Sequence, residues 1–278
     1  PESVPAFSEK ELLGMSDMSY ADRAFEVFSR LLTDFTPEEI RHCVDSAYND
    51  KNFDSANIAE LTRLAEGKFI LELWHGPTCA FKDMALQILP YLLTTSAKKT
   101  VDGKHIAILV ATSGDTGKAA LEGFKDVDGT SIAVFYPEDG VSPMQKRQMT
   151  TQDGGNVFVS AVKGNFDDCQ NGVKAIFTDK AIAEKLAKND ILLSSANSIN
   201  WGRLAPQIVY YISSYVELVK NKEIKFGDKI NVVVPTGNFG NILAAYYAKL
   251  MGIPVNKLIC ASNSNNVLTD FINTGIYD

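Results

Sequence analysis

HIAILVATSGDTGKAALEGF, residues 105–124, joins a short apolar run to a helical pattern through a turn rich in glycine. The same order recurs in later short apolar runs that alternate with helical patterns: SIAVFYP (131–137), NVFVSAV (156–162), ILLSSA (191–196), KINVVVPT (229–236) and KLICAS (257–262). Strands that alternate with helices predict an α/β fold in which helices cover both faces of a parallel sheet. The run INVVVP (230–235) is apolar rather than alternating, which predicts a strand buried on both faces.

The first seventy residues carry helical patterns instead. SYADRAFEVFSRLL (19–32) has apolar residues at helical spacing, and TPEEIRHCVDSAY (36–48) opens with a threonine cap and a proline at the first helical position. We therefore expect a helical N-terminal segment ahead of the α/β part. Two domains fit a length of 278 residues, although no linker rich in proline or serine marks a boundary between them.

The composition limits the classes of function. A net charge of −7 argues against a surface that binds nucleic acid. No apolar run is as long as the roughly 18 residues needed to span a membrane. The four cysteines are scattered without CxxC spacing, which is typical of reduced thiols in a cytoplasmic protein. The three histidines do not combine with the cysteines into a metal-binding cluster, so we expect no metal.

HGPTCAFKDMAL, residues 75–86, places Lys82 where an apolar helix is expected to begin. The segment that follows, MALQILPYLL (84–93), is almost wholly apolar. A lysine ammonium is costly to bury unless it is paired or its charge is removed. Two simple alternatives are that Lys82 extends to the surface or pairs with the adjacent Asp83.

Two glycine-containing loops follow predicted strands. TGNFGN (236–241) lies between a strand and an apolar helix, where free N–H groups and the helix dipole would bind a phosphate. The alternative is a plain turn that needs glycine for its backbone angles. Because the loop is neither a Walker loop nor GxGxxG, it does not indicate a nucleotide.

The second loop, ATSGDTG (111–117), places small hydroxyl residues around a glycine, which suits a carboxylate or phosphate. Asp115 would repel such an anion, so we expect its carboxylate to face a donor such as a hydroxyl. The alternative function of this loop is to cap the next helix through Ser113, Asp115 or Thr116.

A lysine beside an apolar helix, together with two anion-binding loops at strand ends, indicates a cofactor that carries an aldehyde and a phosphate. Pyridoxal phosphate has both groups, and lysine binds its aldehyde as a Schiff base. In that form Lys82 no longer brings an ordinary ammonium into an apolar pocket.

Five motifs occur in the order seen in threonine synthases of the bacterial and fungal type, which the chain resembles throughout: HGPTCAFKDMALQ, ATSGDTG, SAVKGNFDDCQ, SANSINWGRLAPQIVYY and PTGNFGN. The resemblance implies a fold-type-II pyridoxal-phosphate enzyme of two domains, similar in fold to the tryptophan synthase β subunit. It implies conversion of O-phospho-L-homoserine and water to L-threonine and phosphate, by γ-elimination followed by β-addition of water.

The resemblance also implies roles for residues at matching positions. Lys82 matches the lysine that forms the Schiff base. One loop matches the family's loop for the cofactor phosphate, and it consists of Gly237, Asn238, Phe239, Gly240 and Asn241. A second loop matches the one that faces the substrate carboxylate and the cofactor's ring hydroxyl. It consists of Ser113, Gly114, Asp115 and Thr116, and Asp115 is the residue that would face the ring hydroxyl. An anionic substrate tail is expected near Asn197, Asn200 and Arg203, and the alternative for Arg203 is a surface ion pair.

We divide the chain into a helical N-terminal segment with the cofactor lysine (1–103), a smaller α/β subdomain (104–163) and a larger α/β domain that binds the cofactor (164–278). The resemblance implies a cytoplasmic monomer or homodimer that binds a small substrate and neither nucleic acid nor membrane. The chain starts without methionine, and we expect the partner of the cofactor's ring nitrogen beyond residue 278. A polypeptide of these 278 residues alone is expected to aggregate or to hold the cofactor poorly.

Three alternatives remain. One is a related pyridoxal-phosphate enzyme that acts on another phospho-amino acid, or that eliminates phosphate without forming threonine. Another is a non-catalytic protein that binds pyridoxal phosphate or a phosphorylated metabolite, against which the presence of Lys82 argues. A nucleotide-binding Rossmann protein is disfavoured because no GxGxxG follows a first strand.

Overall fold

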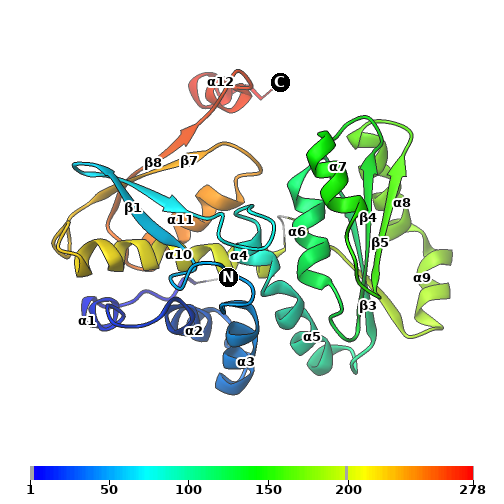
Figure 1. Cartoon of the computed structure of the whole chain (residues 1–278), viewed down its shortest axis with the longest axis horizontal. Coiled ribbons are helices and arrows are strands. Elements are labelled where there is room, and N and C mark those ends of the chain that lie inside the picture. The colour runs from blue at the N-terminus through cyan, green and yellow to red at the C-terminus, as the bar shows by residue number, and fades with distance from the viewer. Residues whose placement is uncertain (1–2, 198–199, 278) are drawn as a thin grey trace. The chain divides into compact units, whose positions relative to one another are not determined.

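The computed structural model describes residues 3–197 and 200–277. Its contacts divide the chain into two compact units. Unit 1 consists of Pro1–Asp17 and Gln207–Asp278, and unit 2 consists of Met18–Pro206. Each unit has its own helices and its own parallel strands (Figure 1). In the described part of the chain, no helix is long and apolar enough to cross a membrane.

Unit 2 begins with the helices predicted from the N-terminal patterns. Helix α2 (Tyr20–Leu31) is capped by Ser19, whose hydroxyl accepts a hydrogen bond from the Asp22 N–H. Helix α3 (Pro37–Ala47) opens with a capping box between Thr36 and Glu39 and has proline in its first turn. The prediction of helices in these two segments is confirmed.

A β-hairpin follows, where the sequence analysis expected helix. Strands β1 (Glu60–Ala65) and β2 (Lys68–Glu72) pair antiparallel around a short turn that contains Gly67. Gly67 has a φ of 64°, a conformation that glycine adopts without strain. The helical reading of the first seventy residues is therefore wrong here, because the strands are short and charged residues interrupt their alternating pattern.

The main sheet of unit 2 is parallel, as predicted. Its strands are β3 (His105–Ala111), β4 (Thr130–Pro137), β5 (Val157–Val162) and β6 (Ile191–Ser194), in the order β5-β4-β3-β6. Because β6 pairs with β3, residues on both sides of 163 share one sheet. The domain boundaries drawn at 103 and 163 therefore do not coincide with the units of the structure.

Helices lie on both faces of this sheet (Figure 1). Helices α6 (Asp115–Phe124) and α7 (Pro143–Thr150) lie on one face, and α8 (Phe166–Thr178) and α9 (Lys180–Ala187) lie on the other. Helix α8 ends before Asp179, whose carboxylate caps α9. Helices α4 (Asp83–Leu86) and α5 (Leu89–Thr100) complete the layer that carries Lys82. One buried hydrophobic core includes Leu86 of α4, Ile108 of β3 and Phe124 of α6.

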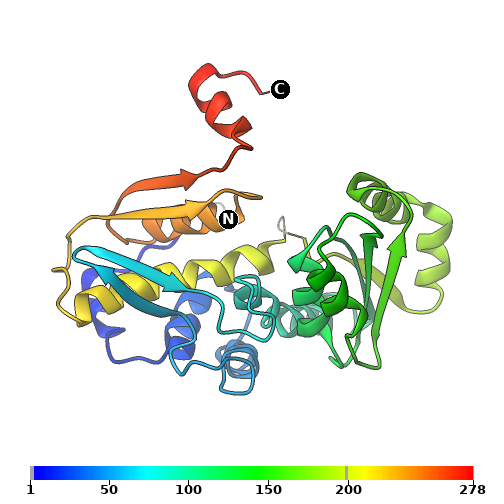
Figure 2. The same cartoon turned by 45° about the horizontal axis from the view of Figure 1, so that its top comes forward.

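Unit 1 contains a smaller βαβ arrangement (Figure 2). Strands β7 (Ile230–Pro235) and β8 (Val255–Ala261) are parallel and are joined through helix α11 (Gly240–Leu250). Helix α1 (Glu9–Gly14), the part of α10 (Trp201–Lys220) from Gln207 onward and α12 (Val267–Thr274) complete the unit.

One face of the β7–β8 sheet is open within the described residues. Val233 and Ile259 are opposite each other across the two strands and are 61% and 41% exposed, whereas Val234 is buried. The prediction that the run 230–235 is buried on both faces is therefore wrong for the described chain. An apolar strand is buried on both faces only when other elements pack against each face of its sheet. In the described residues, no element covers Val233 and Ile259.

Candidate active site

Lys82 lies at the start of α4, and its side chain is only 16% exposed. Its Nζ donates to Asp115 Oδ1 at 2.6 Å, and the ammonium also lies 5.3 Å from the centroid of the Phe81 ring. Both simple alternatives are wrong, because Lys82 neither extends into solvent nor pairs with Asp83. Asp115 thus faces a hydrogen-bond donor, as expected, and that donor is the Lys82 side chain. The pair joins α4 to the first residue of α6, at the carboxyl end of β3.

Asp83 is fully buried and holds the loop before Lys82. Its carboxylate accepts hydrogen bonds from the N–H and hydroxyl of Thr78, at 2.8 and 2.7 Å. Burial raises the pKa of Asp83, while these hydrogen bonds act to lower it. A Cβ on Gly76 would lie 2.5 Å from Asp83 Cβ, so the loop backbone folds directly over this carboxylate. Asp83 therefore fixes the backbone that presents Lys82.

The loop after β3 is closed by Thr112, which the sequence analysis did not single out. The hydroxyl of this buried residue accepts from the N–H groups of Gly114 and Gly117, both at 3.1 Å. The helix cap is Gly114, without a side-chain hydrogen bond. The alternative that Ser113, Asp115 or Thr116 caps this helix is therefore wrong. The Asp115 carboxylate is used instead by Lys82.

Gly123 on α6 is a second residue that the sequence analysis missed. A Cβ at this position would lie 2.0 Å from the carbonyl oxygen of Leu86, the last residue of α4. The two helix backbones therefore touch, and this contact sets the separation of the elements that carry Lys82 and Asp115. The only sign in the sequence is a glycine inside a helical pattern, which costs about 1 kcal/mol relative to alanine.

The segment after β6 brings Asn200 and Arg203 into unit 2. The side chain of Asn200 donates to the Ser195 carbonyl and accepts from the Gly202 N–H, so it ties the start of α10 to the preceding loop. Asn197 is exposed, and its carbonyl accepts from the Asn200 N–H.

Arg203 is 4% exposed, and its guanidinium donates to the Ala196 carbonyl at 2.8 Å. The surface ion pair considered for Arg203 is therefore wrong. Burial lowers the pKa of Arg203 to about 10, and the charge of Asp115 opposes this shift. The guanidinium consequently stays charged at neutral pH.

The second predicted loop, residues 237–241, follows β7 in unit 1. Neither Gly237 nor Gly240 has a positive φ, so the alternative that the turn needs glycine for its angles is wrong. The left-handed residue is Phe239, with a φ of 60°. A Cβ on Gly237 would meet no atom within 4 Å, and one on Gly240 would meet only Gln207 Nε2, at 3.8 Å. The glycines therefore leave open space beside the backbone at the start of α11.

Comparison with known proteins identifies the family of the chain. A family model described as pyridoxal-phosphate dependent enzyme matches residues 57–278, and another, described as threonine synthase N terminus, matches residues 1–48. The chain belongs to the pyridoxal-phosphate-dependent enzyme family.

Within that family the chain is similar to threonine synthases and threonine synthase-like proteins. It is 44% identical to threonine synthase-like 1 of Mus musculus over 285 residues, which cover the whole chain and 38% of the mouse protein. It is 39% identical to threonine synthase of Schizosaccharomyces pombe and spans 54% of that protein. The structure matches pyridoxal-phosphate-bound threonine synthase from Brucella melitensis with a TM-score of 0.89 and 36% identity, covering the whole chain and 57% of the Brucella chain.

These matches confirm the predicted α/β fold and the predicted cofactor, pyridoxal phosphate. Each unit has residues that fit a part of this molecule. In unit 2, the half-enclosed amine of Lys82 at a strand end fits an aldehyde. In unit 1, open space beside Gly237 and Gly240 fits a phosphate close to the backbone. No described residue accepts a hydrogen bond from the N–H groups of residues 237–241, which leaves these donors for a ligand.

His75 lies between β2 and α4, ahead of Lys82, and contacts two carboxylates. His75 Nδ1 lies 2.7 Å from Asp54 Oδ1, and Nε2 lies 3.0 Å from Glu72 Oε2. Glu60 is the third member of a group with Glu72 and His75 whose ligand atoms lie within 4.8 Å of one another. Two carboxylates can both accept from one imidazole only when both ring nitrogens carry protons. The geometry therefore indicates an imidazolium that bridges two carboxylates.

This bridge predicts a pH-dependent contribution to stability. Burial acts to lower the pKa of His75, but the hydrogen bonds to Glu72 and Asp54 and the charges of Asp54 and Glu60 outweigh it, so the pKa is raised. The contribution should be complete below about pH 6.5, the ordinary value, and should disappear as pH rises through the raised value. Urea denaturation should show His75→Asn less stable than the unsubstituted protein at pH 6 and equally stable at pH 9.

Removing one carboxylate provides the control for this prediction. Glu72→Gln should reduce the pH dependence of the His75→Asn effect, because the imidazolium loses its more buried partner. An equal loss of stability at pH 6 and pH 9 would show that the ring acts through packing alone.

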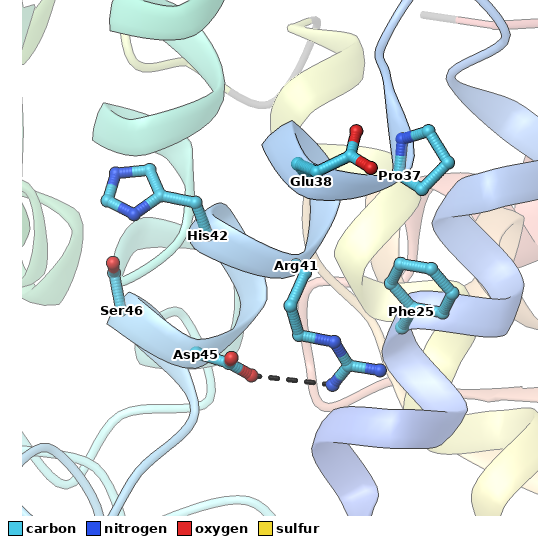
Figure 3. Close-up of a pocket in the computed structure, with 7 residues that line it drawn as sticks. All are labelled: Phe25, Pro37, Glu38, Arg41, His42, Asp45 and Ser46. Atoms are coloured by element: carbon cyan, nitrogen blue, oxygen red, sulfur yellow. Dashed lines mark hydrogen bonds and ion pairs between the residues drawn. The ribbon is translucent and has the colours of Figure 1, made fainter.

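A hollow of about 660 Å³ between α2 and α3 is a less suitable site (Figure 3). Arg41 Nη1 lies 3.0 Å from Asp22 and 3.4 Å from Asp45, and the guanidinium stacks over the Phe25 ring at 4.4 Å. The positive charge of Arg41 is thus already neutralised by two carboxylates. Lys82 and Asp115 therefore remain the candidate site.

Proposed function

We propose that the protein is a threonine synthase, which uses pyridoxal phosphate to convert O-phospho-L-homoserine and water to L-threonine and phosphate. The observation that carries this proposal is the amine of Lys82, enclosed at the carboxyl end of β3 and 2.6 Å from Asp115. The similarity to threonine synthases supports the choice of substrate. The chain spans 54% of the S. pombe enzyme, and the activity is proposed for the whole protein.

Lys82 and Asp115 have complementary roles in this proposal. When bound, pyridoxal phosphate supplies an aldehyde that reacts with amines and a ring that accepts electrons from the substrate carbon atoms. Lys82 Nζ would hold the aldehyde and, once the substrate amine has replaced it, would move protons at the substrate Cα and Cβ. Asp115 keeps Nζ in place in the free protein and would accept a hydrogen bond from the cofactor's ring hydroxyl in the loaded protein.

Anion-binding groups would orient the cofactor and substrate. The backbone N–H groups of residues 237–241 would hold the cofactor phosphate at the start of α11, where the helix dipole favours negative charge. Ser113, Gly114 and Thr116 would bind the substrate carboxylate. Asn197, Asn200 and Arg203 would act on the substrate's anionic tail, for which the buried charge of Arg203 is best suited. The Asn200 amide already has two backbone partners, so its contribution would be to position Arg203.

The protein's other properties follow the same proposal. We expect O-phospho-L-homoserine as its small-molecule partner, with no nucleic acid and no membrane. We also propose a monomer or homodimer in the cytoplasm, and the free cysteines accord with that compartment.

A second function is favoured by one finding. Relatives that are 44% identical to the chain are named threonine synthase-like 1 rather than threonine synthase. A related lyase that removes phosphate from a phospho-amino acid without forming threonine would use the same lysine and the same two loops. The two functions differ in whether water is added at Cβ.

Product analysis separates the two functions. The protein loaded with pyridoxal phosphate is incubated with O-phospho-L-homoserine, and both phosphate and threonine are measured, with L-homoserine as the matched substrate that lacks the phosphate ester. A threonine synthase should release phosphate and threonine in equal amounts and should be inactive on L-homoserine. Phosphate without threonine would establish the lyase, and the absence of both products would refute the proposed reaction.

A further inference from the structure

The loop 237–241 of unit 1 contains an unusual backbone conformation at its middle residue. Phe239 precedes α11 with φ 60° and ψ −5°, in the left-handed region that bulky residues disfavour. A left-handed residue followed by a helical one turns successive N–H groups toward a common point, which is an anion-binding arrangement. Such a conformation persists only when the surrounding structure holds it. The first turn of α11 must therefore be anchored.

The anchor is Asn241, in that first turn. Its side-chain oxygen, Oδ1, accepts hydrogen bonds from the hydroxyls of Tyr210 and Tyr211 on α10. Both tyrosines are buried, with exposed fractions of 0% and 8%. Because two donors converge on Oδ1, the amide orientation is fixed. Asn241 Nδ2 has no acceptor among the described residues, so this donor is left for a ligand at the loop.

The charge pattern makes this amide important for a phosphate. The segment from residue 230 to 248 contains no lysine or arginine. A phosphate at this loop would therefore depend on N–H donors rather than on a positively charged side chain of the loop. An amide that turned by 180° would present a carbonyl oxygen to the phosphate instead of a donor, and would repel it.

We propose that Tyr211, assisted by Tyr210, is a positioning residue that directs the amide nitrogen of Asn241 toward the cofactor phosphate. The inference rests on the proposed function, because it needs a phosphate at residues 237–241. In this proposal Tyr211 does not contact the cofactor and acts only through Asn241. Tyr210 is the weaker partner, since its hydroxyl also lies 3.1 Å from Gln207 Oε1 and its one proton is shared between two acceptors.

A structural role alone is the competing explanation, because a buried tyrosine hydroxyl needs some hydrogen-bond partner. Tyr215 on the same helix provides the matched control. It is fully buried, and its hydroxyl bonds only backbone groups, donating to the Asp228 carbonyl and accepting from the Gly227 N–H. Tyr215→Phe removes a buried hydroxyl from α10 without affecting Asn241.

The test compares pyridoxal phosphate with pyridoxal, which has the aldehyde but no phosphate. Dissociation constants for both are measured by absorbance titration of the cofactor-free protein, for the unsubstituted protein and for Tyr211→Phe and Tyr215→Phe. In Tyr211→Phe, the dissociation constant for pyridoxal phosphate should rise about fivefold to tenfold while that for pyridoxal is unchanged. Tyr215→Phe should leave the ratio of the two constants unchanged.

A double substitution tests the route through Asn241. If Tyr211 acts through this amide, Tyr211→Phe should add no further loss of pyridoxal phosphate affinity to Asn241→Ala. An unchanged ratio in Tyr211→Phe, an equal loss for both ligands, or a further loss in the double variant would each overturn the inference. If the unsubstituted protein itself bound both ligands equally, the phosphate assignment within the proposed function would fail instead.

Discussion

Lys82→Ala is expected to remove covalent attachment of the cofactor and to lower turnover about 1,000-fold or more. In the proposed reaction, the side chain would supply the amine that holds the aldehyde and the group that moves protons at Cα and Cβ. The fold should survive, because α4 is capped by backbone geometry at Lys82 without a side-chain hydrogen bond. The measurements are the visible absorbance of the bound cofactor and the initial rate of phosphate release from O-phospho-L-homoserine.

Lys82→Arg separates the amine chemistry from the ion pair. Arginine keeps a positive charge that can reach Asp115, yet its guanidinium stays protonated and does not react as an amine. We expect Lys82→Arg to retain the stability of the unsubstituted protein and to be as inactive as Lys82→Ala. Substantial turnover in Lys82→Arg would mean that Lys82 serves only as the partner of Asp115.

Gly123→Ala is expected to have the largest effect on stability. Its new Cβ would lie 2.0 Å from the carbonyl oxygen of Leu86, and neither atom belongs to a flexible side chain. One of the two helices must therefore move. Overpacking costs typically 1–3 kcal/mol and occasionally more, and a clash between backbones belongs at the upper end, about 3 kcal/mol. The movement should also displace Lys82 from Asp115, so both the denaturation midpoint and the retained cofactor should decrease.

The same substitution elsewhere provides the control for Gly123. Gly172 lies inside α8, and a Cβ there would meet no atom within 4 Å. Alanine favours helix over glycine by about 1 kcal/mol, so Gly172→Ala should be neutral or stabilising. Equal effects of the two substitutions would show that the contact between α4 and α6 does not control the position of Lys82.

Local patterns predicted the helices α2 and α3 and the later alternation of strands and helices. The run 105–124 forms strand, turn and helix as expected, because apolar periodicity and glycine placement are local properties. The hairpin at 60–72 was missed because its strands are short and partly exposed, which weakens the alternating pattern. The open face of β7 could not be foreseen, since burial depends on which layers cover a strand and not on the strand's own residues.

The side-chain partners within the candidate site were less predictable. The sequence indicated Lys82 and Asp115 separately, but their contact joins residues 33 positions apart. Gly123 and Tyr211 escaped notice because their roles arise from a backbone contact and from a hydrogen bond between two helices. Interactions of this kind are created by tertiary packing and leave no periodic pattern.

Borohydride reduction followed by peptide mapping can establish whether Lys82 carries the cofactor. Trypsin cleaves after lysine, and the cleavage sites next to Lys82 are Lys68 and Lys98. A reduced phosphopyridoxyl group on Lys82 blocks cleavage there. The account predicts one labelled peptide spanning residues 69–98, in place of the separate peptides 69–82 and 83–98. A label on another lysine, or normal cleavage at Lys82 in fully loaded protein, would contradict the account.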